Sequence, residues 1–371
     1  MANTSLRKAS KAKNDEFYTQ LADIENELKH YKDQLKGKVV FCNCDDPFES
    51  NFFKYFAMNF NQIGLKKLIA TCYDPSPVAN TQLSLFGDDV PIKHKGMKKF
   101  ANHAYKIELD HVLDIDKSGS IGIADIEKML EAEKAILKNG GSSSILSYLD
   151  GDGDFRSDEC IELLKQADVV ITNPPFSVFR EYIAQLVEYD KKFLIIGNKN
   201  AITYKEVFSL IKNSKLWLGY RNINSDMWMI LPDGVEKYEK IINGNKVKHI
   251  MACWFTNLYV DKSSRPIIPY LTFEKGRATG LYPKYDNYDA IEVSKVAEIP
   301  EDYDGVMGVP ITFLDKWTPS SNIEIVKFRK GDDDKDLTYT ERERERKVQP
   351  YFRILIRYRR AGQIRRGEHN A

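Results

Sequence analysis

Several features are scarce in this chain of 371 residues, and each scarcity excludes a class of protein. No apolar run approaches the roughly eighteen residues that a transmembrane helix needs, so we expect no membrane partner. The start of the chain lacks the apolar core of a secretion signal, which predicts a cytoplasmic protein. Lys and Arg (55) nearly balance Asp and Glu (54), so the net charge of +1 does not by itself indicate a polyanionic partner.

Cysteine is also scarce. The five cysteines are odd in number and lie mostly in strand-like or helix-like runs. This pattern suits reduced thiols in a cytoplasm and argues against a disulfide framework. Cys42 and Cys44 lie close together, but no second close pair of cysteine or histidine completes the four ligands of a zinc site. We therefore expect buried strand thiols at these positions.

Hydrophobic residues make up 42% of the chain and follow alternating helix and strand patterns. The patterns predict helices over 15–35, 47–60, 157–167, 177–189 and 203–212, and strands over 38–44, 65–73, 168–172, 193–197 and 216–219. Continuous apolar strands between amphipathic helices predict an α/β fold with a mostly parallel sheet that is covered on both faces. Ligands of such sheets bind at the carboxyl ends of the strands.

The tetrapeptide Asn173-Pro174-Pro175-Phe176 directly follows one of these predicted strands. A rigid diproline turn at a strand end holds one amide and one ring in place. The amino group of a flat base can donate hydrogen bonds to the Asn173 side-chain carbonyl and the Pro174 backbone carbonyl, while Phe176 stacks on the ring. The nitrogen lone pair then points at an incoming methyl group. The motif therefore predicts methyl transfer to an amino group, and the alternative is a proline turn that caps the following helix.

Acidic residues at other strand ends and in one loop could hold a methyl donor built from adenosine and methionine. Asp74 is a candidate for the ribose hydroxyls, although an Asp before proline is also typical of a turn. Asp154 can accept a hydrogen bond from the adenine amino group, and Phe155 can lie against the adenine ring. Asp45 and Asp46 can hold the methionine amino group.

Eight segments, in chain order, carry a family resemblance. They are residues 13–20, 41–47, 51–56, 151–157, 172–176, 202–208, 282–289 and 305–310. In these segments the chain resembles the EcoRI-type adenine-N6 DNA methyltransferases. The resemblance covers nearly the whole chain except an insertion at about 76–148 and a divergent stretch at 220–275. The chain lacks a Phe-x-Gly-x-Gly after its first strand, a departure that this family shares.

The resemblance implies a Rossmann-like fold that binds S-adenosylmethionine, and adenine-N6 methylation of a flipped-out base in double-stranded DNA. It implies a bacterial restriction-modification or orphan modification enzyme, acting as a monomer, with a cognate restriction endonuclease as a separate partner where one exists. Phe17, Tyr18 and Thr19 match the family's N-terminal cofactor-contacting motif. The alternatives left open are an RNA adenine-N6 methyltransferase and a catalytically inactive DNA-binding module.

The insertion contains a sequence with the spacing of an EF-hand loop over 114–125. Oxygen ligands stand at positions one, three and five, glycine at six, an apolar residue at eight and an acid at twelve. The candidate Ca²⁺ ligands are Asp114, Asp116, Ser118, Ser120 and Asp125. The twelfth residue is Asp instead of Glu, and the alternative is a cap-rich turn. Calcium here would be structural.

We expect two functional regions. Residues 1–219 form the S-adenosylmethionine-binding and catalytic domain, which carries the insertion, and residues 220–371 form a target-recognition and C-terminal basic region. Polar and basic side chains there can contact phosphates or base edges. The candidate DNA-binding residues are Arg221, Asn222, Lys248, Arg357 and Arg359.

Overall fold

The structure is a computed structural model, and it describes residues 18–44, 46–48, 50–72, 104–231, 238–264, 266–267, 270–341 and 345–359. The chain forms two compact units. The first holds the described residues up to Ala201 together with Ser225–Tyr259, and the second holds Ile202–Asn224 and the described residues from Val260 onward. Among the helices described, none combines the length and apolarity that a membrane span requires.

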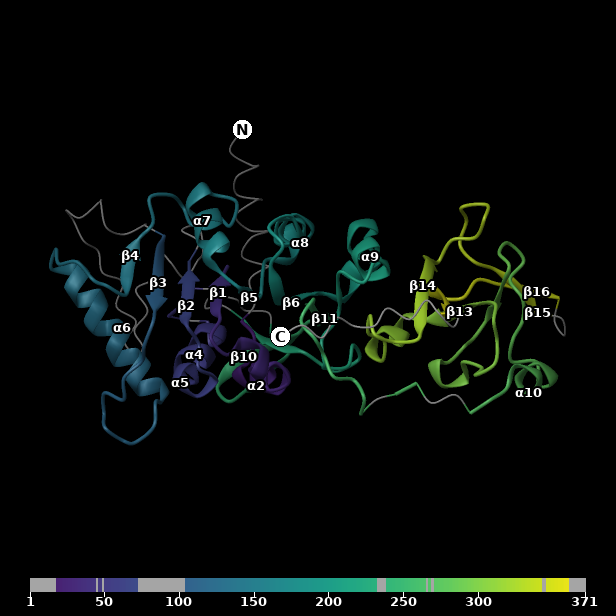
Figure 1. Cartoon of the computed structure of the whole chain (residues 1–371), viewed down its shortest axis with the longest axis horizontal. Helices are drawn as coiled ribbons and strands as arrows, with labels where there is room; N and C mark the ends of the chain where they lie inside the picture. Colours follow the sequence, from purple (N-terminus) through teal and green to yellow (C-terminus); the bar gives the residue numbers. More distant parts are fainter. Residues whose placement is uncertain are drawn as a thin grey trace. The chain divides into compact units, whose positions relative to one another are not determined.

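A mixed sheet forms the centre of the first unit, with strand order β4-β3-β2-β1-β5-β6-β11 (Figure 1). Its strands are β1 (Val39–Asn43), β2 (Lys67–Thr71), β3 (Tyr105–Leu109), β4 (Leu146–Tyr148), β5 (Val169–Thr172), β6 (Lys192–Asn198) and β11 (Ala252–Thr256). The four central strands, β2-β1-β5-β6, are parallel, whereas β3, β4 and β11 run antiparallel to their neighbours. The α/β prediction is confirmed, and the antiparallel edges depart from a fully parallel sheet.

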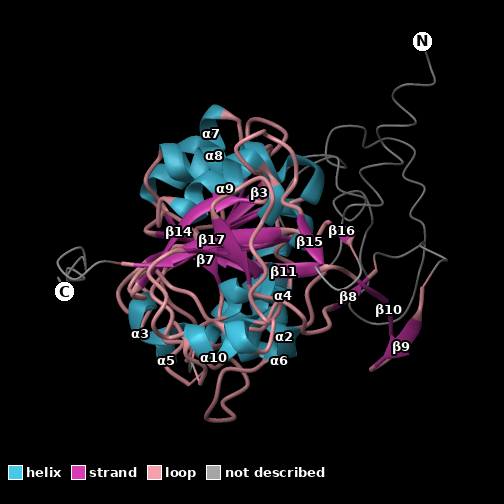
Figure 2. Ribbon diagram, turned by 90° about the vertical axis from the view of Figure 1, so that its right-hand side faces the viewer, coloured by secondary structure: helices cyan, strands magenta, loops and turns pink. Residues whose placement is uncertain are grey.

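Helices lie on both sides of this sheet (Figure 2). One side carries α2 (Leu21–Leu28), α3 (Lys32–Leu35), α4 (Asn51–Met58), α5 (Phe60–Ile63) and α6 (Ile123–Lys138), and the other carries α7 (Asp158–Gln166) and α8 (Phe179–Glu188). Every residue of β1 and β5 is buried, as expected for strands that are covered on both faces. At Gly197 in β6, a Cβ atom would lie 2.4 Å from the Phe179 ring, so glycine permits the close packing of α8 on the sheet.

One predicted helix start is wrong. The helix expected from Pro47 begins instead at Asn51, because Ser50 is the residue that caps it. The Ser50 hydroxyl oxygen accepts two backbone N–H groups of the first turn at 3.2 and 3.4 Å. Asp46 does not cap the helix, since its carboxylate accepts the backbone N–H of Phe48 at 2.9 Å and forms a local turn. The helix predicted over 15–35 is also divided, into α2 and α3.

The described part of the expected insertion belongs to the central sheet. β3 pairs with β2, β4 pairs with β3, and α6 connects them along the chain. Ile107, Leu109 and Leu146 are buried apolar side chains of these strands. Residues 104–148 are thus an integral edge of the first unit and not an appendage to it.

The divergent stretch 220–275 is shared between the two units, so the observed division does not follow the expected boundary at 219/220. The reason is the apolar run Ala252–Thr256, which pairs with β6 along its whole length and is fully buried. Preceding it are β8 (Trp228–Ile230), β9 (Lys240–Ile242) and β10 (Asn245–His249), which form a separate sheet in the order β8-β10-β9.

The second unit is built on a four-stranded sheet in the order β12-β13-β17-β14. Its elements are α9 (Lys205–Lys212), β7 (Trp217–Leu218), α10 (Phe273–Ala278), β12 (Ala290–Glu292), β13 (Val306–Pro310), β14 (Ile323–Phe328), β15 (Tyr339–Glu341), β16 (Arg346–Val348) and β17 (Arg353–Tyr358). Ile354, Leu355 and Ile356 of β17 are fully buried. The buried Glu292 carboxylate accepts hydrogen bonds from Arg353 Nε at 2.9 and 3.1 Å and from Arg353 Nη2 at 2.7 Å.

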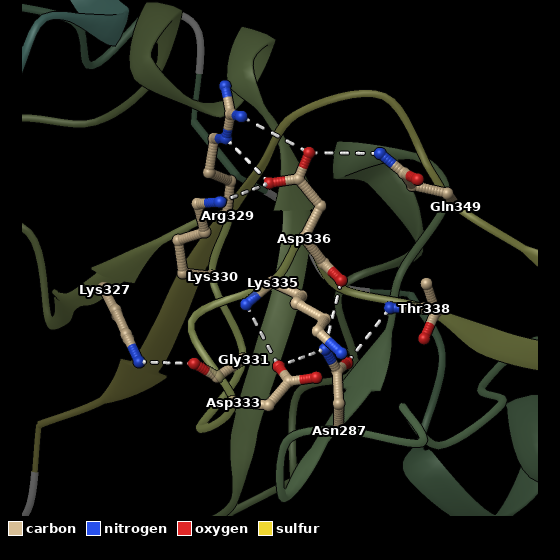
Figure 3. A network of polar contacts seen from close by, with 10 residues as sticks. All are labelled: Asn287, Lys327, Arg329, Lys330, Gly331, Asp333, Lys335, Asp336, Thr338 and Gln349. Carbon is tan, nitrogen blue, oxygen red and sulfur yellow. Dashed lines mark hydrogen bonds and ion pairs between the residues drawn. The ribbon is translucent and has the colours of Figure 1, made fainter.

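A charge-rich segment of this unit, residues 329–338, is held by polar contacts within the segment and with Asn287 and Gln349 (Figure 3). The Asp336 carboxylate accepts hydrogen bonds from Arg329 Nε at 3.0 Å and from Gln349 Nε2 at 3.1 Å. Asn287 Nδ2 donates to Asp333 Oδ1 at 2.9 Å and to the Asp336 carbonyl at 3.0 Å. Arg329 and Lys330 both form ion pairs with Asp336, so these three charges are matched within the chain.

Candidate active site

The candidate site lies at the carboxyl ends of the parallel strands of the first unit. The chain order reverses between β1 and β5, which is where α/β sheets commonly bind ligands. Asn43 ends β1 and Thr172 ends β5, and the Thr172 hydroxyl donates a hydrogen bond to the Asn43 backbone carbonyl. The hydroxyl of Tyr182, a buried residue of α8, donates to Asn43 Oδ1. These contacts hold the two strand ends together directly before Asn173.

The predicted catalytic tetrapeptide occupies this edge. Asn173 is buried, with 8% of its surface exposed, and Pro174 is buried as well. Pro175 and Phe176 are partly exposed, and Phe176 begins a short 3₁₀ helix, Phe176–Val178, that leads into α8. The diproline turn therefore precedes a helix, as the alternative interpretation expected, and it also places Asn173 at the reversal point of the sheet.

Asp46 is held by a residue that the sequence did not single out. Tyr105, the first residue of β3, donates its hydroxyl hydrogen to Asp46 Oδ1 at 2.6 Å. Burial raises the pKa of Asp46, while the hydrogen bonds from Tyr105 and the Phe48 N–H act in the opposite direction. Tyr105 lies in the expected insertion and has no motif around it, so only the pairing of β3 with β2 could reveal its role.

The loop before α7 packs against the end of β2. Gly153 has φ +77°, and a Cβ atom there would lie 2.1 Å from the carbonyl oxygen of Cys72. Only glycine meets both conditions, the left-handed backbone and the close approach. Phe155 is 8% exposed, its ring meets Tyr182 edge-on at 5.1 Å between centroids, and its carbonyl accepts a hydrogen bond from Gln185 at 3.0 Å.

The Asp154 carboxylate already has an intramolecular partner. Arg156 Nε and Nη2 donate to its two oxygens at 2.9 and 2.7 Å, and this guanidinium lowers the pKa of Asp154. The Arg156 guanidinium also lies 5.1 Å from the Phe155 ring centroid. The predicted contact between Asp154 and adenine stays a prediction, and it would share the carboxylate with Arg156.

Part of the predicted N-terminal motif contacts β8 and α4. Tyr18 pairs with Ile230 through two backbone hydrogen bonds, at 2.9 and 2.8 Å. The Thr19 carbonyl accepts a hydrogen bond from Asn51 Nδ2 at 2.8 Å. The hydroxyl oxygens of Thr19 and of Thr71, the last residue of β2, are buried and have no hydrogen-bond partner among the described residues. Phe17, Asp45 and Asp74 lie outside the described residues.

Three of the five predicted calcium ligands come together. Carboxylate oxygens of Asp114, Asp116 and Asp125 lie within 4.8 Å of one another. Backbone N–H groups of the loop bind these carboxylates, including those of Gly122 and Ile115, each at 2.9 Å from Asp125. Ser118 donates its hydroxyl hydrogen to the Ser120 carbonyl at 3.0 Å. The arrangement is also that of a self-capped turn, so calcium binding stays a prediction.

The five predicted DNA-binding residues are distributed over both units. Lys248 is exposed on β10 of the first unit, whereas Arg221 and Asn222 belong to the second. Arg357 pairs with a carboxylate of β14, and Arg359 donates to a backbone carbonyl at 3.1 Å. These two arginines therefore also have structural partners.

Comparison with known proteins identifies the family of this chain. The family described as adenine-specific methyltransferase EcoRI matches residues 5–359. The chain belongs to this family. The EcoRI methyltransferase family implies S-adenosylmethionine as the methyl donor.

Three curated relatives agree with this EcoRI methyltransferase assignment. The chain is 47% identical to the type II methyltransferase M.EcoRI of Escherichia coli, over 96% of this chain and 97% of that protein. It is 35% identical to M.MgeORF184P of Mycoplasma genitalium and 35% identical to M.MpnI of Mycoplasma pneumoniae, each over 84% of this chain and 82% of the relative. No solved structure matches significantly.

Residues at and around the carboxyl ends of β1 and β2 have the polar and aromatic groups that the methyl donor of the EcoRI methyltransferases requires. The two buried hydroxyls of Thr19 and Thr71 can bind polar groups of a ligand, and Asp46 offers a carboxylate to an ammonium group. Gly153 brings its loop close to the end of β2, and Phe155 adds an aromatic face. Of these residues, Thr71 and Gly153 were not predicted as site residues.

Proposed function

We propose that this chain is a site-specific DNA adenine-N6 methyltransferase in which Asn173 and Pro174 hold the target amino group. The observation that carries the proposal is the placement of Asn173, buried at the carboxyl end of β5 beside the reversal point of the sheet. Its side-chain carbonyl and the Pro174 carbonyl accept hydrogen bonds from the adenine N6 amino group. Phe176, which is partly exposed, stacks on the base.

The chain's own residues supply positioning. We propose a Rossmann-like arrangement in which Asp46 and the Tyr18–Thr19 segment hold the donor and Phe155 borders its adenine. S-adenosylmethionine, when bound, supplies an electrophilic methyl group. Asn173 orients the amino nitrogen toward it, and such pre-positioning accounts for several kcal/mol of a reaction barrier. No base of unusual pKa is required, because the amino proton is lost after the nitrogen has been alkylated.

The substrate that we propose is double-stranded DNA, from which the adenine is flipped at a cost of a few kcal/mol. Support comes from the type II methyltransferases to which the chain is similar over most of its length. We assign target recognition mainly to residues from 220 onward, and we propose that the protein acts as a monomer. Any cognate endonuclease would share the DNA sequence without forming a stable complex.

Methylome sequencing of a methylation-free bacterial host that expresses the chain tests this function. One N6-methyladenine motif in the genome would support it. Asn173→Ala should abolish the modification while binding of S-adenosylmethionine, measured by calorimetry, stays within about threefold of wild type, because the donor is held elsewhere. Asn139→Ala, an exposed position after α6, is the matched control and should retain activity.

The same experiment separates the alternatives. An unmodified genome with folded protein would reject the DNA proposal, and methylation assays on structured RNA would then test the RNA alternative. Failure of the protein to bind S-adenosylmethionine would instead indicate an inactive binding module.

A further inference from the structure

An exposed β-hairpin projects from the first unit. β9 and β10 pair in an antiparallel ribbon and are joined by the two-residue turn Asn243-Gly244 (Figure 2). Both turn residues have positive φ, +48° and +83°, which is the geometry of a tight type I′ hairpin. The ribbon is therefore a preformed element, whose register fixes which side chains share a face.

One face of this ribbon combines an apolar side chain with lysines. Ile241 stands opposite Lys246, and Lys248 follows two residues later on the same face. Ile241 is 58% exposed, and both lysines are exposed as well. Because Ile241 is exposed beside two exposed lysines, its side chain is available for contact with a bound molecule.

The charge of the hairpin indicates what that molecule is. Residues 238–249 contain three lysines and one glutamate. Lys240 and Lys246 lie over the aromatic rings of Trp228 and Tyr238, at 3.4 and 5.5 Å from the ring centroids. Among the described residues, no carboxylate forms an ion pair with any of the three lysines. A two-stranded ribbon with unneutralised lysines fits a groove of duplex DNA, where the phosphates supply the missing negative charge.

The hairpin is also tied to the proposed donor site. β10 pairs with β8, and Ile230 of β8 exchanges two backbone hydrogen bonds with Tyr18. Gln20 Nε2 donates to the carbonyl of Trp228 in β8 at 2.5 Å. Backbone pairing thus connects the exposed ribbon to the segment that carries Thr19, and the hairpin belongs to the unit that carries Asn173.

We infer that the β9–β10 hairpin is a DNA-contacting arm of the catalytic unit, in which Lys246 and Lys248 bind phosphates and Ile241 enters the base stack. The inference deepens the proposed function and rests on it for the role of Ile241. Apolar side chains inserted between bases unstack the duplex at the point of insertion. Ile241 then occupies the space vacated by the flipped adenine and keeps it from returning.

The phosphate contacts are tested first, without knowledge of the target sequence. Fluorescence anisotropy of a 30-base-pair duplex gives the affinity of the full chain at several salt concentrations. Lys246→Ala/Lys248→Ala should reduce the slope of log K against log salt by about 2, since each phosphate contact contributes about 0.9. Lys36→Ala/Lys128→Ala removes two exposed lysines outside the hairpin and should leave the slope unchanged. Equal slopes for wild type and the hairpin variant would overturn the inference.

The role of Ile241 is tested on duplexes that carry the motif found by methylome sequencing. Ile241→Ala should lower the methylation rate about tenfold on a fully paired duplex but less than about threefold when the base opposite the target is abasic, because flipping then costs less. Ile241→Leu should restore the rate. An equal loss on both duplexes would refute the insertion of Ile241. If no methylation is found at all, the proposed function fails, while the salt measurement still tests the DNA contact.

Discussion

Replacement of Gly153 by alanine tests whether the loop that carries Asp154 and Phe155 is needed in its observed place. The backbone at Gly153 has φ +77°, a conformation that costs an L-residue about 1–2 kcal/mol. The new Cβ would lie 2.1 Å from the Cys72 carbonyl oxygen, a contact that no real Cβ atom makes. Since the neighbour is backbone and not a flexible side chain, the loop or the end of β2 must move.

From these two effects we expect Gly153→Ala to lower the free energy of unfolding by about 2–4 kcal/mol. Because the displaced loop borders the proposed donor site, the affinity for S-adenosylmethionine should fall at least about tenfold. Urea denaturation measures the first quantity, and calorimetric titration of the folded variant measures the second.

Gly151 provides the matched control in the same loop. Its φ is not in the left-handed region, and nothing lies within 4 Å of a Cβ placed there. Gly151→Ala should therefore change stability by less than about 1 kcal/mol and leave donor affinity nearly unchanged. If the two variants behave alike, the packing of this loop against β2 does not govern the site.

Two further substitutions test the electrostatics. Tyr105→Phe removes a hydrogen bond that lowers the pKa of Asp46, so the pKa of Asp46 should rise further in this variant. The carboxylate is then protonated at higher pH, and the loss of S-adenosylmethionine affinity on acidification should begin at higher pH than in wild type. Calorimetric titrations between pH 5 and 8 check this, and an unshifted midpoint would contradict the role of Asp46. Glu292→Gln removes the buried carboxylate that pairs with the partly buried Arg353 guanidinium, and it should destabilise the protein by about 3–5 kcal/mol in urea. Glu324→Gln, in a more exposed pair, should cost under about 1 kcal/mol. Comparable losses for the two variants would argue against burial as the cause.

Much of this protein can be predicted from local patterns in its sequence. The apolar runs that became β1, β5 and β6 are continuous because their strands are covered on both faces, so periodicity alone indicated buried parallel strands. Asn173-Pro174-Pro175-Phe176 indicated a functional turn because its rigidity is encoded within four residues. The family resemblance added the chemistry, and the match over residues 5–359 confirms the family.

Other features depend on contacts between residues that are distant in the chain. Tyr105 meets Asp46 across 59 positions only because β3 pairs with β2, and no pattern around either residue predicts that pairing. The run Ala252–Thr256 could have paired with any strand edge, and tertiary packing placed it against β6 in the first unit. The need for glycine at Gly153 likewise comes from the Cys72 carbonyl across the site. Local sequence determines which segments form strands and turns, whereas partners, edges and close approaches are decided by which surfaces can be buried together.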